Sequence, residues 1–194
     1  MQLATDRLII RDWRPLYDAQ QAWDIYGDLR VTRWLQSEAD DSIHVTQERL
    51  RRYGERTGNG LGVWAVVEQA IDRAIGSILL VPLPNNDGTD SGKVEIGWHF
   101  RPASWGYGYA SEAANAVLNY GFTTLNLDEI YAVTTPDNLR SQRVMARLSM
   151  EPQGITNNHY NRPLQIYRLE AADYSSGQLA SMVDSTASAS APLT

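Results

Sequence analysis

Two unlike sequence patterns meet at Trp105-Gly106-Tyr107-Gly108-Tyr109-Ala110-Ser111-Glu112-Ala113. Before this stretch, residues 94–100 have the pattern of a β-strand; after it, apolar residues recur at the three-and-four spacing of an α-helix. Glycines let such a turn bend tightly and approach a ligand, and the first N–H groups of the helix lack partners within it. With the positive end of the helix dipole, these N–H groups predict an anion site suited to a pyrophosphate. A plain glycine-eased turn is the alternative.

The elements on either side of this turn predict a mixed α/β fold. Short β-branched runs predict strands at residues 7–11, 61–68, 74–81, 94–100, 129–135 and 164–169. Apolar residues at helical spacing predict helices at residues 13–26, 42–57, 110–125 and 138–148. The second, third and fourth strands read as an antiparallel meander, with a long polar loop at 84–92 before the last of them. We expect one domain over residues 1–172 and a flexible Ser/Ala/Thr-rich tail at 173–194.

The composition limits the class of protein. The 194 residues include 17 basic and 23 acidic side chains, giving a net charge of −6, so no nucleic-acid partner is expected, because phosphate contacts need a basic surface. The chain contains no cysteine, which excludes disulfides and thiolate nucleophiles, and its widely spaced His44, His99 and His159 predict no metal site. No apolar run reaches the ~18 residues of a membrane span, and no signal peptide is visible. We therefore expect no membrane partner and a cytoplasmic location.

Further motifs accompany the glycine turn, in order along the chain. They are Thr5-Asp6-Arg7-Leu8, Val94-Glu95-Ile96-Gly97-Trp98, Asn138-Leu139-Arg140-Ser141 with Arg143-Val144, and Ile166-Tyr167-Arg168-Leu169. Together they make residues 3–170 resemble the GNAT superfamily of N-acetyltransferases, and within it the RimJ/RimL-like branch. The resemblance implies a mixed, mostly antiparallel sheet with flanking helices, in which a splayed pair of strands holds acetyl-CoA. The implied activity is direct transfer of the acetyl group to a primary amine, either a protein N-terminal amine or a small amine.

The resemblance also implies which residues bind acetyl-CoA. Backbone amides of the turn would wrap its pyrophosphate, namely those of Trp105, Gly106, Tyr107, Gly108, Tyr109 and Ala110, with Ser111 beside them. The strand end at Trp98, His99 and Phe100 would contact pantetheine through its backbone, and an N–H group there could hold the oxyanion of the reaction. Asn138, Ser141 and Arg143 would contact the cofactor from the late helix. A helix N-cap also explains Asn138, and a solvated helix face explains Arg143 equally well.

The implied reaction needs a base, because amines react in the neutral form while alkyl and α-amines have pKa values of about 10 and 8. Glu95 is the first expected base, since its strand borders the cofactor gap; its alternative role is to anchor the substrate ammonium. His99 is the second, because its ordinary pKa suits proton transfer; otherwise it is a hydrogen-bonded wall residue. Strand alternation places both on one face. By the resemblance, Ser141 is a candidate acid for the departing thiolate.

Two positions depart from the superfamily pattern. Met145 stands where many members have a tyrosine acid, and a thioether cannot donate a proton. Leu148-Ser149-Met150 replaces the usual Leu-Gly-Phe. These departures leave a non-catalytic CoA-binding or sensing module of the same fold as the alternative function. A dinucleotide enzyme is disfavoured, because its glycines would follow the first strand of a parallel unit, whereas here a meander precedes them.

The remaining charged residues suggest little about partners. The arginines at 49, 51, 52 and 56 are interleaved with Glu48 and Glu55, a pattern typical of a solvated helix face. Asp40 and Asp41 read as surface charge. An amine acceptor is the expected partner, and a homodimer is possible because it is common among the proteins that the chain resembles.

Overall fold

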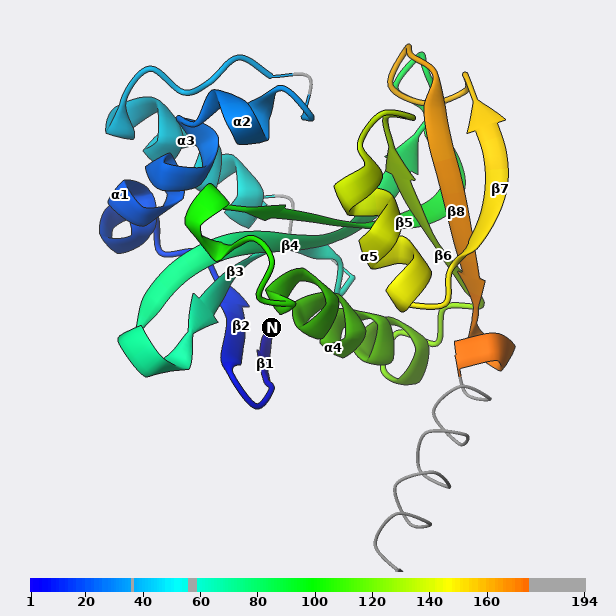
Figure 1. Cartoon of the computed structure of the whole chain (residues 1–194), viewed down its shortest axis with the longest axis horizontal. Coiled ribbons are helices and arrows are strands. Elements are labelled where there is room, and N and C mark those ends of the chain that lie inside the picture. Colours follow the sequence, from blue (N-terminus) through cyan, green and yellow to red (C-terminus); the bar gives the residue numbers. More distant parts are fainter. Residues whose placement is uncertain (36, 56–58, 175–194) are drawn as a thin grey trace, which may run out of the picture.

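An eight-stranded sheet forms the centre of the protein, in the strand order β1-β2-β3-β4-β5-β6-β8-β7 (Figure 1). The computed structural model describes residues 1–35, 37–55 and 59–174. The strands are β1 (Gln2–Ala4), β2 (Leu8–Asp12), β3 (Gly62–Glu68), β4 (Arg73–Pro84), β5 (Asp90–Phe100), β6 (Glu129–Thr134), β7 (Glu151–Thr156) and β8 (Leu164–Glu170). The helices are α1 (Pro15–Tyr26), α2 (Leu29–Thr32), α3 (Ile43–Glu55), α4 (Tyr109–Thr123) and α5 (Leu139–Arg147). All neighbouring strands are antiparallel except β5 and β6, which confirms the predicted mixed sheet.

Three of these strands and helices lie outside the sequence prediction, namely β1, α2 and β7, as do two short 3-10 helices at Gln69–Ile71 and Pro102–Ser104. β1 and α2 have only three and four residues, too few for a periodic pattern. β7 is an edge strand exposed over almost its whole length, so it lacks the alternation of a half-buried strand. The predicted loop at 84–92 is instead a tight hairpin, because β4 extends to Pro84 and β5 begins at Asp90.

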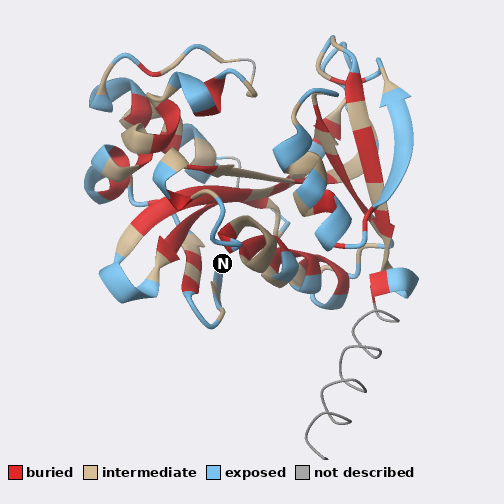
Figure 2. Ribbon diagram, in the orientation of Figure 1, coloured by how far each residue is buried: buried red, intermediate tan, exposed pale blue. Residues whose placement is uncertain are grey.

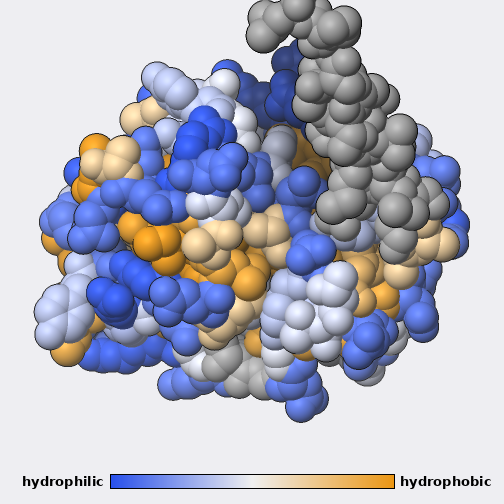
Figure 3. Space-filling model, turned by 90° about the horizontal axis from the view of Figure 1, so that it is seen from below, coloured by the Kyte–Doolittle hydropathy of each residue, from blue (hydrophilic) through white to orange (hydrophobic). Residues whose placement is uncertain are grey.

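Helices cover both faces of the sheet (Figures 1 and 2). On one face, Trp64 and Val66 of β3 belong to the same core cluster as residues of α4. On the other face, Ala65 and Val67 belong to a cluster with residues of α1 and α3. Burial on both faces explains why β3 reads as a continuous apolar run. The face seen from below carries mainly hydrophilic residues with apolar ones between them (Figure 3), as is usual for protein surfaces.

The parallel neighbours β5 and β6 separate where the cofactor was expected. Their paired register is limited to one position, Glu95 opposite Tyr131, and the two strands then run in different directions (Figure 1). Alternation along β5 follows the prediction: Ile96 and Phe100 enter the core beneath α4, while His99 lies against Tyr26 of α1. Residues 95–100 of β5 and residues 133–134 of β6 line a cleft at this divergence.

The packed part of the chain extends two residues beyond the expected boundary at 172. Residues 171–174 form a helical turn, and the buried Tyr174 packs on Phe122 of α4 with a ring separation of 5.1 Å. Residues 173 and 174 therefore belong to the folded domain. The rest of the predicted tail, residues 175–194, lies outside the described part of the chain.

The end of α5 explains the departure at Ser149. The Ser149 N–H donates to Ala146 and the Met150 N–H to Met145, both at 3.1 Å, which is the Schellman arrangement that ends many helices. It requires a left-handed residue after the helix, and Ser149 has φ = 58°. Because of this left-handed conformation, serine occupies a position that favours glycine. The neighbouring Leu148 and Met150 are buried in the core.

We expect Ser149→Gly to raise the free energy of unfolding by about 1 kcal/mol, because glycine has no Cβ to strain the left-handed conformation. The melting temperature should rise by about 3 °C. Ser149→Ala is the matched control and should give no gain, since alanine keeps the Cβ. An unchanged or lower melting temperature for the glycine variant would contradict this explanation of the helix end.

Candidate active site

A cleft of about 810 Å³ runs between β5, β6 and the amino ends of α4 and α5. It collects nearly all the residues that the sequence suggested for a site. Those lining it are Glu95, Trp98, His99, Phe100, Trp105, Gly106, Gly108, Tyr109, Ala110, Ser111, Asn138, Ser141 and Arg143. Tyr107 is the exception, because its side chain is 63% exposed and stacks on Tyr109 instead of lining the cleft.

The glycine turn presents backbone donors to one end of the cleft. Gly106 and Gly108 have φ values of 87° and 82°, a conformation that glycine adopts without strain. Gly108 is the N-cap of α4 and supplies no side-chain cap, so the first N–H groups of the helix have no side-chain acceptor there. The buried Ser111 hydroxyl also lacks a hydrogen-bond partner among the described residues. These donors, with the helix dipole, fit a pyrophosphate.

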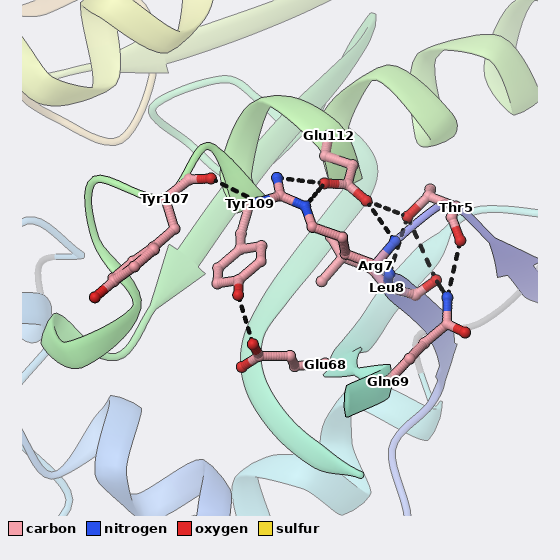
Figure 4. Close-up of polar contacts among 8 residues, drawn as sticks. All are labelled: Thr5, Arg7, Leu8, Glu68, Gln69, Tyr107, Tyr109 and Glu112. Atoms are coloured by element: carbon pink, nitrogen blue, oxygen red, sulfur yellow. Dashed lines mark hydrogen bonds and ion pairs between the residues drawn. The ribbon is translucent and has the colours of Figure 1, made fainter. Parts of the chain in front are cut away.

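The N-terminal motif Thr5-Asp6-Arg7-Leu8 holds this turn in place (Figure 4). Arg7 donates from Nε to Glu112 Oε2 at 2.7 Å and from Nη1 to the Tyr107 carbonyl at 3.0 Å. The Thr5 hydroxyl donates to Glu112 Oε1 at 2.6 Å. Burial alone would raise the pKa of Glu112, but these hydrogen bonds outweigh it and the pKa is lowered. Arg7 therefore both positions the turn and offsets a carboxylate charge near the anion site.

We expect Arg7→Met to weaken binding of acetyl-CoA, the predicted co-substrate, by about 5- to 10-fold, because one charge-assisted contact to the turn is lost and the Glu112 charge is unscreened. Calorimetric titration measures the effect. Arg30→Met is the control, since Arg30 forms a comparable exposed ion pair with Asp28 and does not line the cleft. Equal affinities for the two variants would show that Arg7 has no role in positioning the turn.

The amino end of α5 adds positive charge at the same end of the cleft. Asn138 Oδ1 accepts from the Ser141 N–H at 3.3 Å, which confirms Asn138 as the N-cap. Arg140 lies over the Trp105 ring at 4.7 Å, and Arg143 and Arg147 also line the cleft. An acidic protein thus has a local pole suited to anions, built from two helix ends with Arg140 and Arg143, while Arg147 lines the cleft from the last turn of α5.

Glu95 lies at the single pairing position of β5 and β6, and its side chain is buried. The Tyr160 hydroxyl donates a short hydrogen bond to Glu95 Oε1. Burial raises the pKa of Glu95 to about 7, against the lowering effects of the Tyr160 hydrogen bond and the Arg162 charge. A base with a pKa near the working pH is suited to proton transfer.

His99 has the opposite character. Its Nδ1 lies 3.2 Å from the Tyr26 hydroxyl, which in turn lies 2.6 Å from the Ser77 hydroxyl. Burial, with a smaller effect of the Arg49 charge, lowers the pKa of His99 to about 4. The imidazole is therefore neutral at pH 7 and a weaker base than Glu95. This geometry fits the alternative role of a hydrogen-bonded wall residue.

Met145 is buried, yet its side chain also lines the cleft. It provides no proton donor. Ser141, one helical turn earlier on α5, places a hydroxyl-bearing residue on the same wall. Ser141 is therefore the hydroxyl-bearing residue that α5 contributes to the cleft.

Several cleft residues were missed by the sequence analysis. Arg49 was expected on a solvated helix face and Asp40 as surface charge, but Arg49 forms a two-point ion pair with the buried Asp40 and lies 4.7 Å from the centre of the Tyr26 ring. Both predictions are wrong for these residues, because α3 packs against α1. Tyr160 and Arg162 lie between β7 and β8 without any local motif, and only the fold brings them to Glu95.

Comparison with known families accounts for this fold and cleft. A family model described as an acetyltransferase (GNAT) domain matches residues 7–151. The chain belongs to the GNAT family of acetyltransferases. It is 30% identical over 155 residues to the uncharacterized N-acetyltransferase YnaD of Bacillus subtilis, covering 80% of this chain and 85% of that one.

Solved structures show the same fold. A GNAT-family acetyltransferase from Bacillus anthracis superimposes with a TM-score of 0.74 at 26% identity, covering 89% of this chain and 99% of the other. The ribosomal-protein-S5-alanine acetyltransferase of Vibrio fischeri has a TM-score of 0.68 at 17% identity, covering 90% and 98%, a likeness of fold alone. Within the described ranges, no helix is long and apolar enough to cross a bilayer, and no cluster of three His, Asp or Glu side chains is placed to hold a metal ion.

Proposed function

We propose that the protein transfers the acetyl group of acetyl-CoA to a primary amine within this cleft. The supporting observation is that one cleft joins an anion-binding pole, at the amino ends of α4 and α5, to a buried carboxylate with a pKa near 7. The first feature suits the pyrophosphate of CoA, and the second suits proton removal from an ammonium group. Family membership supports acetyl transfer as the reaction.

Acetyl-CoA supplies an activated thioester, and the protein's own residues do the rest. The turn from Trp105 to Ala110 and the nearby arginines hold the phosphates, while the end of β5 aligns the pantetheine arm. Glu95 takes a proton from the ammonium group, directly or through water, so that the nitrogen lone pair attacks the carbonyl carbon. A C–N bond forms, the nitrogen gives its second proton to water, and the C–S bond breaks as the tetrahedral intermediate collapses. The departing sulfur receives a proton from water or from Ser141, which then recovers one from water. Holding both reactants together lowers the activation free energy by several kcal/mol, on the order of 7.

We expect Ser141→Ala to lower kcat about 10-fold, less than the usual effect of about 100-fold or more for an acid or base, because a thiolate is a good leaving group. The Kd of CoA should change less than twofold. Stopped-flow thiol release and calorimetry separate these quantities. Ser141→Thr is the matched control, since it keeps a hydroxyl and should retain most of the activity. A large rise in Kd with unchanged kcat would reassign Ser141 to cofactor binding.

Thiol release from acetyl-CoA with a panel of amines tests the proposal. N-terminal peptides, polyamines and small amines should be included, because the resemblance to the RimJ/RimL-like branch and the distant ribosomal-protein acetyltransferase structure suggest protein N-termini as one acceptor class. Release that depends on an amine supports the enzyme. CoA binding without turnover on any amine would favour the alternative, a CoA-binding or sensing module, which the buried Met145 at the usual acid position motivates. A homodimer and a cytoplasmic location stay predictions.

A further inference from the structure

The connection between β7 and β8, residues 157–163, forms part of the cleft wall. Hydrogen bonds to the β4–β5 hairpin hold it in place. Asn86, at the tip of the β4–β5 hairpin, donates to the Asn157 carbonyl at 2.7 Å and accepts from the Asn161 N–H at 2.8 Å. His159 Nδ1 lies 2.8 Å from the Pro84 carbonyl. Tyr160 has φ = 55°, a conformation rarely adopted outside glycine. These contacts fix the direction of the side chains that follow.

Arg162 is the second residue of this connection that faces the cleft. Its Nη2 donates a long hydrogen bond, 3.4 Å, to the Trp34 carbonyl on the opposite side. Its Nε is buried and has no hydrogen-bond partner among residues 1–35, 37–55 and 59–174. Within the same ranges no carboxylate lies within 4.0 Å of its guanidinium. A half-buried cation with a buried, unused donor is costly unless an anion pairs with it.

Arg49 provides an internal comparison at the same end of the cleft. Its guanidinium is paired at two points with Asp40, so its charge is offset within the protein. Arg162 has no such carboxylate partner, and Tyr160 and Glu95 act on it only through longer-range electrostatic interactions. The Glu95 end of the cleft therefore offers one carboxylate and one unpaired guanidinium, a combination that is complementary to a zwitterion.

This end of the cleft is also lined by many apolar side chains, beside the polar Ser37, Tyr53 and His99. Its lining includes Val31, Trp34, Leu35, Leu79, Val81 and Val133. Such a surface favours a ligand with an apolar body and a few charged groups. Protein N-termini fit less well, because the carbonyl beside their amine is a neutral amide.

We infer that the acceptor is an amino acid or closely similar amine that carries a free carboxylate and an apolar side chain, with Arg162 binding the carboxylate and Glu95 facing the amine. This inference rests on the proposed acetyl transfer and narrows its substrate class. Arg162 is a specificity-determining residue in this account. Its planar guanidinium can bind both carboxylate oxygens at once, which lysine cannot do.

Paired substrates test the inference directly. L-Phenylalanine, L-leucine and L-methionine are each compared with their amides by thiol release at pH 8. We expect kcat/KM of the wild-type protein to favour the acids by about 10-fold or more, although the amides have the less basic amines. In Arg162→Met the acids should lose this preference, to a ratio of about one, because their KM rises. Arg162→Lys should retain part of the preference.

Arg52→Met is the matched control, because Arg52 is exposed on α3 and does not line the cleft, and the acid preference should survive there. Calorimetry of L-phenylalanine against its amide, with CoA present, gives the same comparison without turnover. A preference for amides or peptides, or an acid preference unchanged in Arg162→Met, would overturn the inference while thiol release still supports acetyl transfer. Binding of acids through Arg162 without thiol release on any amine would instead refute the acetyl transfer alone.

Discussion

Replacing Glu95 with glutamine lowers kcat/KM for the amine acceptor by about 100- to 1,000-fold at pH 8, the range expected when a general base is removed. In the wild-type protein the rate rises with pH through about 7, where Glu95 loses its proton. That inflection is absent from Glu95→Gln. The inflection of the free amine, near its own pKa of about 8 to 10, stays in both. Steady-state rates between pH 5.5 and 9.5 measure the two profiles.

The stability of the same variant separates a catalytic loss from misfolding. Because the folded-state pKa of Glu95 is raised from 4.5 to about 7, the folded protein binds more protons than the unfolded chain between these values. Stability is then lost as the pH rises through about 7. Glu95→Gln removes this loss, and its free energy of unfolding should be higher at pH 8 by up to about 3 kcal/mol, with little gain at pH 4.

The catalytic prediction itself has a clear contrary outcome. A pH–rate profile that is unchanged in Glu95→Gln would show that Glu95 is not the base.

Replacing Gly108 with alanine weakens acetyl-CoA binding by about 10- to 30-fold, because a left-handed alanine costs about 1–2 kcal/mol and the turn relaxes away from the geometry that presents its N–H groups. The Cβ itself meets only Arg7 Nη2, at 3.7 Å, so steric exclusion within the protein is not the cause. Calorimetry with acetyl-CoA measures the affinity, and thermal denaturation measures the strain.

Gly88 supplies the matched control for this prediction. It has the same φ of 82° and open space around its Cβ position, but it lies in the β4–β5 hairpin and does not line the cleft. Gly88→Ala should lose stability like Gly108→Ala while keeping its affinity for acetyl-CoA. If both variants bind equally well, the glycine turn is only a structural turn, and the phosphates bind elsewhere.

The parts of the site that a local pattern encodes were predictable. The glycine turn, the N-cap Asn138 and the shared face of Glu95 and His99 each follow from a few consecutive residues, and each is where the sequence places it. The resemblance in motif order supplied the fold, including the splayed β5–β6 pair that composition alone does not predict.

Residues positioned by long-range contacts were not predictable from local patterns. Tyr160 contacts Glu95, and Arg162 lines the same cleft, because the β4–β5 hairpin holds the β7–β8 connection through Asn86. The Asn86–Asn161 contact joins positions 75 residues apart. Arg49 resembles a surface charge in sequence, yet it forms an ion pair with the buried Asp40. The pKa of His99 is lowered by burial, which depends on packing by Tyr26 and not on its own strand.

The most direct test of acetyl transfer is to follow an isotope-labelled acetyl group from acetyl-CoA into the amine by mass spectrometry, together with CoA thiol release. The account predicts one N-acetylated amine for each thiol released, with both signals reduced together in Glu95→Gln and, at low acetyl-CoA, in Gly108→Ala. Acetyl-CoA that binds in the cleft while no amine in the panel gains a labelled acetyl group would contradict it.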